Sequence, residues 1–156
     1  MTYPLLILVL PAVLQGIVMG FDEGWFHRRR GLPRWERLGH PLDTLTTAAC
    51  FAWIVSVPAA TEGALETYIG LSVFSCLFIT KDEFVHARAC SPVEHWLHAL
   101  LFVLHPIVLL CFGWIWWSGS PLWVLEAQLL LTVAFLTYQI LYWSVYWEPQ
   151  PAANPP

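Results

Sequence analysis

The hydrophobic residues of this chain fall into five long runs, which short polar segments separate. A helix needs about 17–25 mostly apolar residues to cross a bilayer. The runs at residues 4–20, 42–60, 63–80, 93–117 and 122–147 have this length. The pattern therefore predicts an all-α, polytopic integral membrane protein with five transmembrane helices, and we expect residues 1–147 to form one domain.

Two polar segments carry signals for helix ends. Ser91, Pro92 and Glu94 form the capping-box pattern that starts a helix. Residues 33–38 are followed by Gly39, which predicts a short interfacial helix with a glycine stop in the first cytoplasmic loop. The proline-rich residues 148–156 predict a disordered tail.

Composition supports the membrane assignment and excludes other classes of protein. Charged residues make up 12% of the chain and hydrophobic residues 58%, whereas a soluble domain carries about 25% charged residues. With a net charge of −4 and seven Lys and Arg, the chain is not a nucleic-acid binder. Ten tryptophans suit the interface with a lipid bilayer, the first expected partner. The four cysteines are dispersed and form no Cys-x-x-Cys pair, which excludes a thiol-redox motif.

The basic residues predict the orientation of the chain. All seven fall in the segments between spans one and two and between spans three and four. The positive-inside rule makes these segments cytoplasmic. We therefore expect the N-terminus outside, the C-terminus in the cytoplasm, and a bacterial inner membrane as the location.

Histidine and acidic residues gather at the cytoplasmic ends of the expected spans. Pairs three or four residues apart share one face of a helix. The pairs are Glu23–His27, His40–Asp43, Glu83–His86, Glu94–His98 and His95–His98. Because these ends belong to four different spans, we expect the side chains to converge on one pocket. Span one, polar loop and span two also resemble span three, polar loop and span four in a coarse way, because both loops are rich in histidine and acid.

Imidazole and carboxylate together are ligands for iron, manganese or zinc. Helical bundles hold two such ions with Glu and Glu-x-x-His motifs, and Glu83–His86 has that spacing. The other pairs do not, so the analogy with di-iron carboxylate proteins is one of ligand chemistry only. The candidate metal ligands are Glu23, His27, His40, Asp43, Glu83, His86, Glu94, His95 and His98. A salt-bridge network in which Arg28–Arg30 supply the cation is the alternative to a metal.

These residues favour a membrane metalloprotein with two iron ions at the cytoplasmic boundary. The expected activity is an oxidoreductase of the hydroxylase, desaturase or oxygenase type, acting on a hydrophobic or lipidic small molecule. A zinc-dependent membrane hydrolase is the first alternative, since zinc needs three protein ligands and one open position. A haem-binding or non-catalytic subunit of a membrane complex and a metal transporter are further alternatives, and a second copy of the chain is a further expected partner.

His105 lies deep in the fourth apolar run, immediately before Pro106. A polar ring at that depth requires a hydrogen-bonding partner. The candidates for this partner are Gln15, Thr47, Ser75 and Tyr138. A structural hydrogen bond and a proton relay both remain open for His105.

Overall fold

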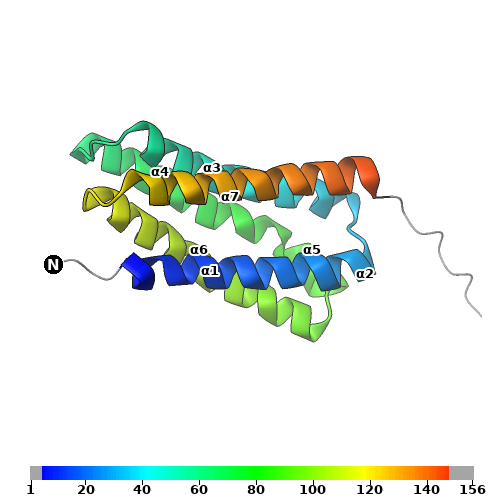
Figure 1. The fold of residues 1–156 in the computed structure, drawn as a ribbon. Helices are drawn as coiled ribbons and strands as arrows, with labels where there is room; N and C mark the ends of the chain where they lie inside the picture. The colour runs from blue at the N-terminus through cyan, green and yellow to red at the C-terminus, as the bar shows by residue number, and fades with distance from the viewer. Residues whose placement is uncertain (1–4, 148–156) are drawn as a thin grey trace, which may run out of the picture.

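Long helices account for most of residues 5–147, the part of the chain that the computed structural model describes (Figure 1). They are α1 (Leu5–Phe21), α3 (Arg34–Ser56), α4 (Glu62–Phe78), α6 (Pro92–Trp117) and α7 (Leu122–Leu141). Short segments continue three of them: η1 (Asp22–His27) and α2 (Arg28–Arg30), then η2 (Ile79–Asp82) and α5 (Glu83–Ala89), and last η3 (Tyr142–Tyr146). No strand occurs within these described residues, so the all-α prediction is confirmed.

Four of the helices are long and apolar enough to cross a membrane. They cover Leu5–Arg30, Glu62–Arg88, Pro92–Trp117 and Leu122–Tyr146. The fifth predicted span falls in α3, whose first ten residues include Arg34, Glu36, Arg37 and Asp43 and lower its hydropathy. The structure thus supports a membrane protein with four apolar spanning helices.

The beginning of α3 differs from the sequence prediction. We expected a short interfacial helix that stops at Gly39 and a second helix that starts near Pro41, but one helix runs through both residues. Gly39 does not have the positive φ that ends a helix, whereas Gly31 has a φ of 72° and ends α2. The separate helix and its glycine stop were therefore wrong, because the stop lies eight residues earlier in the chain, at Gly31.

The other helix ends agree with their sequence signals. Ser91 and Glu94 form the predicted capping box at the start of α6. The α7 helix begins directly after Pro121. The predicted disordered tail, residues 148–156, lies outside the described residues.

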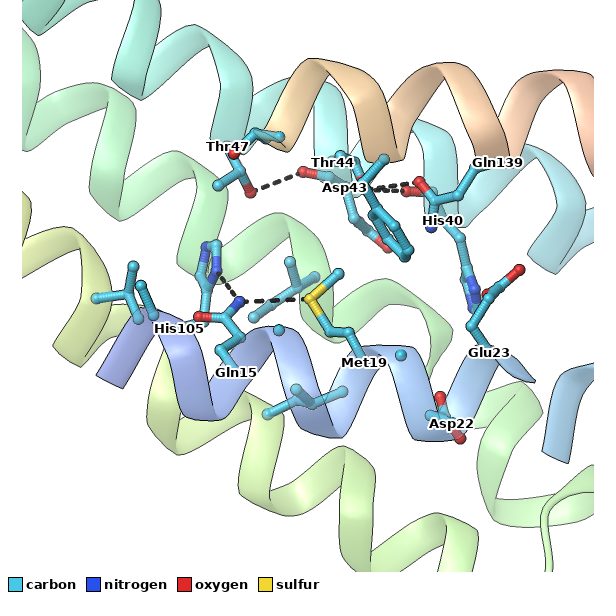
Figure 2. A pocket seen from close by; sticks show the side chains of 18 of the residues that line it. Gln15, Met19, Asp22, Glu23, His40, Asp43, Thr44, Thr47, His105 and Gln139 are labelled. Atoms are coloured by element: carbon cyan, nitrogen blue, oxygen red, sulfur yellow. Dashed lines mark hydrogen bonds between the residues drawn. The ribbon is translucent and has the colours of Figure 1, made fainter. Parts of the chain in front are cut away.

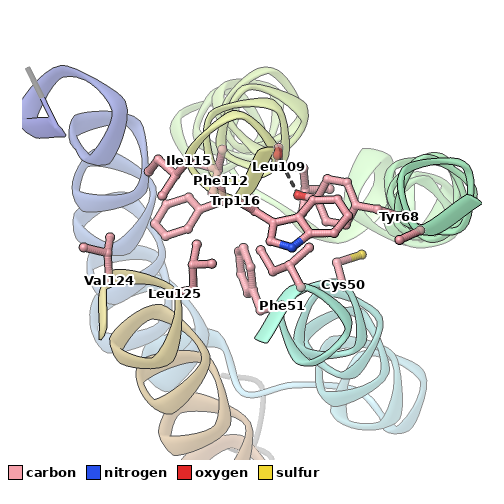
Figure 3. Close-up of a cluster of buried hydrophobic side chains, with 12 residues drawn as sticks. Cys50, Phe51, Tyr68, Leu109, Phe112, Ile115, Trp116, Val124 and Leu125 are labelled. Atoms are coloured by element: carbon pink, nitrogen blue, oxygen red, sulfur yellow. Dashed lines mark hydrogen bonds between the residues drawn. The ribbon is translucent and has the colours of Figure 1, made fainter. Parts of the chain in front are cut away.

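An apolar core fills the end of the bundle away from α2 and α5, and helices α3, α4, α6 and α7 contribute to it (Figure 3). Phe51 and Phe112 meet edge to face with ring centroids 5.3 Å apart. The Tyr68 hydroxyl donates a hydrogen bond of 2.6 Å to the carbonyl of Leu109. At Gly113, an added Cβ would lie 2.6 Å from the Tyr68 ring, so only glycine allows this approach of α4 to α6. The core fixes the helices relative to one another without using any charged side chain.

Packing brings distant parts of the chain together at the opposite end. Helix α1 packs on α6, while α3 packs on α7 and α4. Figure 1 shows α2 and α5 at the same end of the bundle, where α3 and α6 also begin. This arrangement places the ends of four segments rich in histidine and acid next to one another.

Candidate metal centre

Four histidines from four helical segments form a ring at this end of the bundle. His27 comes from η1, His40 from α3, His86 from α5 and His98 from α6. Neighbouring rings around the cluster have centroids 4.1–6.0 Å apart. His27, His86 and His98 are buried and His40 is partly buried. The structure thus brings together the histidines that the sequence placed at four separate helix ends.

Carboxylates lie against this ring of imidazoles. An oxygen of Glu23 lies 3.0 Å from Nδ1 of His27. Oδ2 of Asp22 lies 3.1 Å from Nε2 of His27 and 2.9 Å from Nε2 of His98, so it sits between the two rings. The indole of Trp143, in η3, donates a hydrogen bond to the second oxygen of Glu23. Both ring nitrogens of His27 therefore face carboxylate oxygens. A protonated imidazole would donate a hydrogen bond to each carboxylate, and a cation bound between the ring and a carboxylate would be the other explanation.

Arg30 connects two further buried carboxylates. Its guanidinium lies 2.9 Å from Glu36 and 3.0 Å from Glu94. Arg28 and Arg29 point elsewhere: Arg28 donates to the Tyr138 hydroxyl, and Arg29 lies over the ring of Trp25. Of the three arginines that the sequence offered as cations for a salt-bridge network, Arg30 is thus the one that contacts the cluster.

The charges of this cluster do not balance. Within the described residues, four carboxylates of the cluster are buried, those of Asp22, Glu23, Glu36 and Glu94. Arg30 contacts Glu36 and Glu94, whereas Asp22 and Glu23 face imidazole and indole nitrogens. Burying an ion without a partner costs several kcal/mol. The site therefore requires additional positive charge, either from protonated histidine or from bound cations.

Several buried polar atoms of the cluster have no hydrogen-bond partner within the described part of the chain. They are both ring nitrogens of His86, Nδ1 of His98 and Oδ1 of Asp22. His86 is 6% exposed, and His98 and Asp22 are each 4% exposed, so bulk water does not satisfy these atoms. Buried polar groups without partners are rare in proteins and point to an ion or an ordered water.

The ligand atoms fall into three sets whose members all lie within 4.8 Å of one another. One set is Glu23, His27 and His40; the second is His86, Cys90 and His98; the third is Asp22, His27, Glu94 and His98. The neutral imidazole of His40 has a free nitrogen lone pair that a metal ion can accept. Each set could hold a metal ion with nitrogen, oxygen or sulfur donors.

A cavity of about 380 Å³ extends from the cluster between the helices (Figure 2). Asp22, Glu23 and the four histidines line its end, while Phe51, Phe102 and Phe135 are among its apolar walls. Polar side chains occur along its length, including Gln15, Thr47 and Gln139. The cavity makes the histidines the accessible face of the cluster, since Arg30, Glu36 and Glu94 do not line it.

Three of the predicted ligands lie away from the cluster. Glu83 and His95 pair with each other at 3.0 Å and are about 40% exposed. Asp43 lines the cavity wall and forms an ion pair of 2.6 Å with Lys81. The structure therefore separates Glu83 from His86, although they have the Glu-x-x-His spacing.

His105 lies further along the cavity and has partners for both ring nitrogens. Nε2 lies 3.0 Å from the Ser75 hydroxyl, and Nδ1 lies 3.5 Å from the amide nitrogen of Gln15 (Figure 2). Ser75 is in turn 2.9 Å from the Thr46 hydroxyl. Two of the four partners considered from the sequence, Gln15 and Ser75, are thus the ones that the fold provides.

Sequence reasoning did not select Asp22, Glu36 or Cys90 as ligands, nor Trp143 as a partner of Glu23. Asp22 contacts His98, which is 76 residues away, so no local spacing indicates the pair. The spacing of four residues between Glu36 and His40 was a signal for Glu36. Cys90 lies four residues after His86, and that spacing was a signal for the thiol.

We expect Arg30→Ala to destabilise the protein strongly, because it leaves Glu36 and Glu94 buried without their cation. Removing one partner of a buried ion pair costs about 3–5 kcal/mol. Unfolding in mixed detergent micelles measures the loss. The exposed Arg29→Ala is the matched control and should cost less than about 1 kcal/mol. Adding Glu36→Gln to Arg30→Ala should restore part of the stability; equal losses in the two arginine variants would contradict this account.

Known proteins provide no independent guide to this site. The chain matches no protein-family model, and neither the curated proteins nor the solved structures contain a significant match to it. Function is therefore inferred from the cluster and the cavity, which form a buried histidine and carboxylate centre at one end of a helical bundle.

Proposed function

We propose that this protein is a membrane metalloprotein that holds iron in the histidine and carboxylate cluster and oxidises a hydrophobic substrate. One observation carries the proposal: buried ring nitrogens of His86 and His98 lack hydrogen-bond partners within the described residues, in a cluster with excess negative charge. A metal ion satisfies both requirements at once, since it accepts nitrogen lone pairs and supplies positive charge.

Protonated histidine alone accounts for the cluster less well. A proton on His27 fits its two carboxylate neighbours. Protonating His86 does not help in the same way, because its nearest carboxylate atom, Oε1 of Glu36, is 3.7 Å away and Arg30 already contacts Glu36. The buried ring of His86 is therefore better explained as a metal ligand than as a cation.

The mixture of nitrogen and oxygen donors favours iron. Imidazole with carboxylate is the donor set of non-haem iron proteins, and bundles hold such ions between facing helices. Bound iron would supply the redox chemistry of the reaction class that we propose. The role of the chain is to hold the ion and to bring an apolar substrate to its accessible face.

The cavity supports a substrate that is largely apolar with a polar group. Its volume of about 380 Å³ lies within the range of small-molecule sites. Its walls combine aromatic and aliphatic side chains with Gln15, Thr47 and Gln139. Gly16 and Gly20 of α1 also line it, and a Cβ added to either would meet open space. A chain-like molecule can therefore lie along α1 with its reactive end near Asp22 and the histidines.

We also propose a membrane arrangement with five spans. The 23 residues of α3 extend about 34 Å at 1.5 Å per residue, enough to cross the apolar layer. All seven basic residues lie on α2, α3, η2 or α5, at the end of the bundle that carries the cluster (Figure 1). This end would face the cytoplasm of a bacterium, with the N-terminus outside.

Elemental analysis of the protein, purified in mild detergent without a histidine tag, tests the metal. We expect iron in the wild type and the loss of at least half of it in His27→Ala, because His27 belongs to two of the three ligand sets. His95→Ala is the matched control and should keep its metal, since His95 pairs with Glu83 outside the cluster. One zinc ion per chain would favour a hydrolase instead. No metal above background in the wild type would reject the metal centre.

Filling the cavity tests the substrate site. The probe is a long-chain alcohol with a photoactivatable diazirine, and labelled peptides are mapped by mass spectrometry. We expect Gly16→Leu to weaken labelling of the cavity walls by about tenfold or more, the effect of about 1.4 kcal/mol, while metal content is unchanged. Gly70→Leu, on α4 and also in open space, is the control. Equal labelling in the two variants would exclude this cavity as the binding site.

Reporter fusions test the orientation. A green fluorescent protein fused to the C-terminus should fluoresce in bacteria, and alkaline phosphatase at the same position should be inactive, because we place that end in the cytoplasm. A reporter after residue 119, in the connection between α6 and α7, should behave in the opposite way. The reverse pattern at both positions would invert the topology, and equal behaviour would remove α7 as a span.

A further inference from the structure

The chain contains the same order of ligand residues twice. The first copy is Asp22-Glu23, His27, Glu36 and His40, and the second is Asp82-Glu83, His86, Glu94 and His98. In both copies the second histidine follows the second glutamate after three residues. The first copy has one extra residue before its first histidine and one extra in the segment that follows. The two segments therefore read as repeats of one helix–turn–helix unit.

The fold repeats in the same way. Each copy runs from the end of one long helix, through a short turn, into the start of the next: α1 into α3, and α4 into α6. Helix α1 packs on α6, and its counterpart α4 packs on α3. These contacts exchange when α1 is interchanged with α4 and α3 with α6, as a twofold relation between the units requires. Parallel repeats of this kind are related by an axis along the membrane normal.

The histidine ring has the symmetry of the repeats. Within a repeat, the ring centroids are 4.8 Å apart for His27 and His40 and 4.1 Å apart for His86 and His98. Between repeats, the distances from His27 to His98 and from His40 to His86 are both 6.0 Å. The four imidazoles are therefore two pairs, one from each repeat, rather than one set of four around a single point.

The local backbone accounts for the extra residue before His27. Segment η1 is a π-helical turn, whose hydrogen bonds span five residues instead of four, and it covers Asp22–His27. Glu83–Ala89, the corresponding part of the second repeat, is an ordinary α-helix. The wider turn absorbs the insertion and keeps His27 in the position that matches His86.

We infer that each repeat holds one metal ion, with Glu23, His27 and His40 around the first and His86, Cys90 and His98 around the second. This inference rests on the proposed metal centre and specifies its two positions. Each of these two ligand sets comes entirely from one repeat, and the atoms of each lie within 4.8 Å of one another. Oδ2 of Asp22 lies within 3.1 Å of a nitrogen of both His27 and His98, so this carboxylate contacts one histidine of each set.

Arg30 fits between the repeats. It contacts Glu36 and Glu94, the equivalent glutamates of the two units, at 2.9 and 3.0 Å. The two glutamates share this one guanidinium on the side of the cluster that does not line the cavity. Asp22 and Glu23 are left with the histidines on the cavity side, where the two ions would bind.

Cobalt(II) titration of the chelator-treated full chain in detergent tests the two positions. We expect two ions per chain in the wild type, and one ion, half the content, in His40→Gln and in His86→Gln. The double variant should bind none. Cys90→Ser should remove the thiolate-to-cobalt charge-transfer band and leave the first ion bound. His95→Ala is the control, with both ions retained, because His95 pairs outside the cluster.

The outcomes separate this inference from the proposed function. One cobalt ion per chain in the wild type, lost in His40→Gln and His86→Gln alike, would reject two positions while leaving a metal centre. A thiolate band that persists in Cys90→Ser would remove Cys90 from the second position and overturn the assignment of that ligand set. No bound cobalt, with no metal in the purified protein, would reject both. Circular dichroism and monodisperse elution show that each variant is folded.

Discussion

Four carboxylates buried at one end of an apolar helical bundle are the constraint on which the rest of this structure depends. Asp22, Glu23, Glu36 and Glu94 each lie at 5% exposure or less. The cost of desolvating each of them amounts to several kcal/mol unless a cation lies nearby. Arg30 meets that need for Glu36 and Glu94, and the imidazoles face Asp22 and Glu23. The cluster therefore costs desolvation free energy, and the metal centre proposed above would offset that cost.

Stability comes from the other end of the molecule. The core around Phe51, Phe112 and Trp116 fixes the helices through apolar contacts, and tertiary hydrogen bonds there end on backbone carbonyls. Because this core needs no charged group, the cluster end is free to carry a chemical function. The cavity connects these two regions, since it reaches from the histidines to Phe51.

The sequence predicted the helices well because the thickness of a bilayer sets the length of an apolar run. The sequence predicted the side-chain partners less well, because contacts between different helices decide them. Glu23 and Glu83 each have a histidine at helical spacing. Glu23 contacts its local histidine, His27, whereas Glu83 contacts His95 on the next helix. The pairing of Glu83 with His95 joins α5 to α6, and no spacing within one helix indicates it. The start of α3 was also missed, since Gly39 and Pro41 are helix breakers by propensity but lie within a helix here.

The differences between the repeats explain how one cluster can have two unlike faces. Asp22 contacts an imidazole of each repeat and lines the cavity. Arg30 contacts a glutamate of each repeat and does not line the cavity. The cavity face thus has side chains that can act as metal ligands beside an open volume, and on the opposite face two glutamates share one guanidinium. The π-helical turn of η1 belongs to the first repeat and carries both Asp22 and His27. The residue inserted between Glu23 and His27 therefore lies in the same turn as the carboxylate that contacts both histidine pairs.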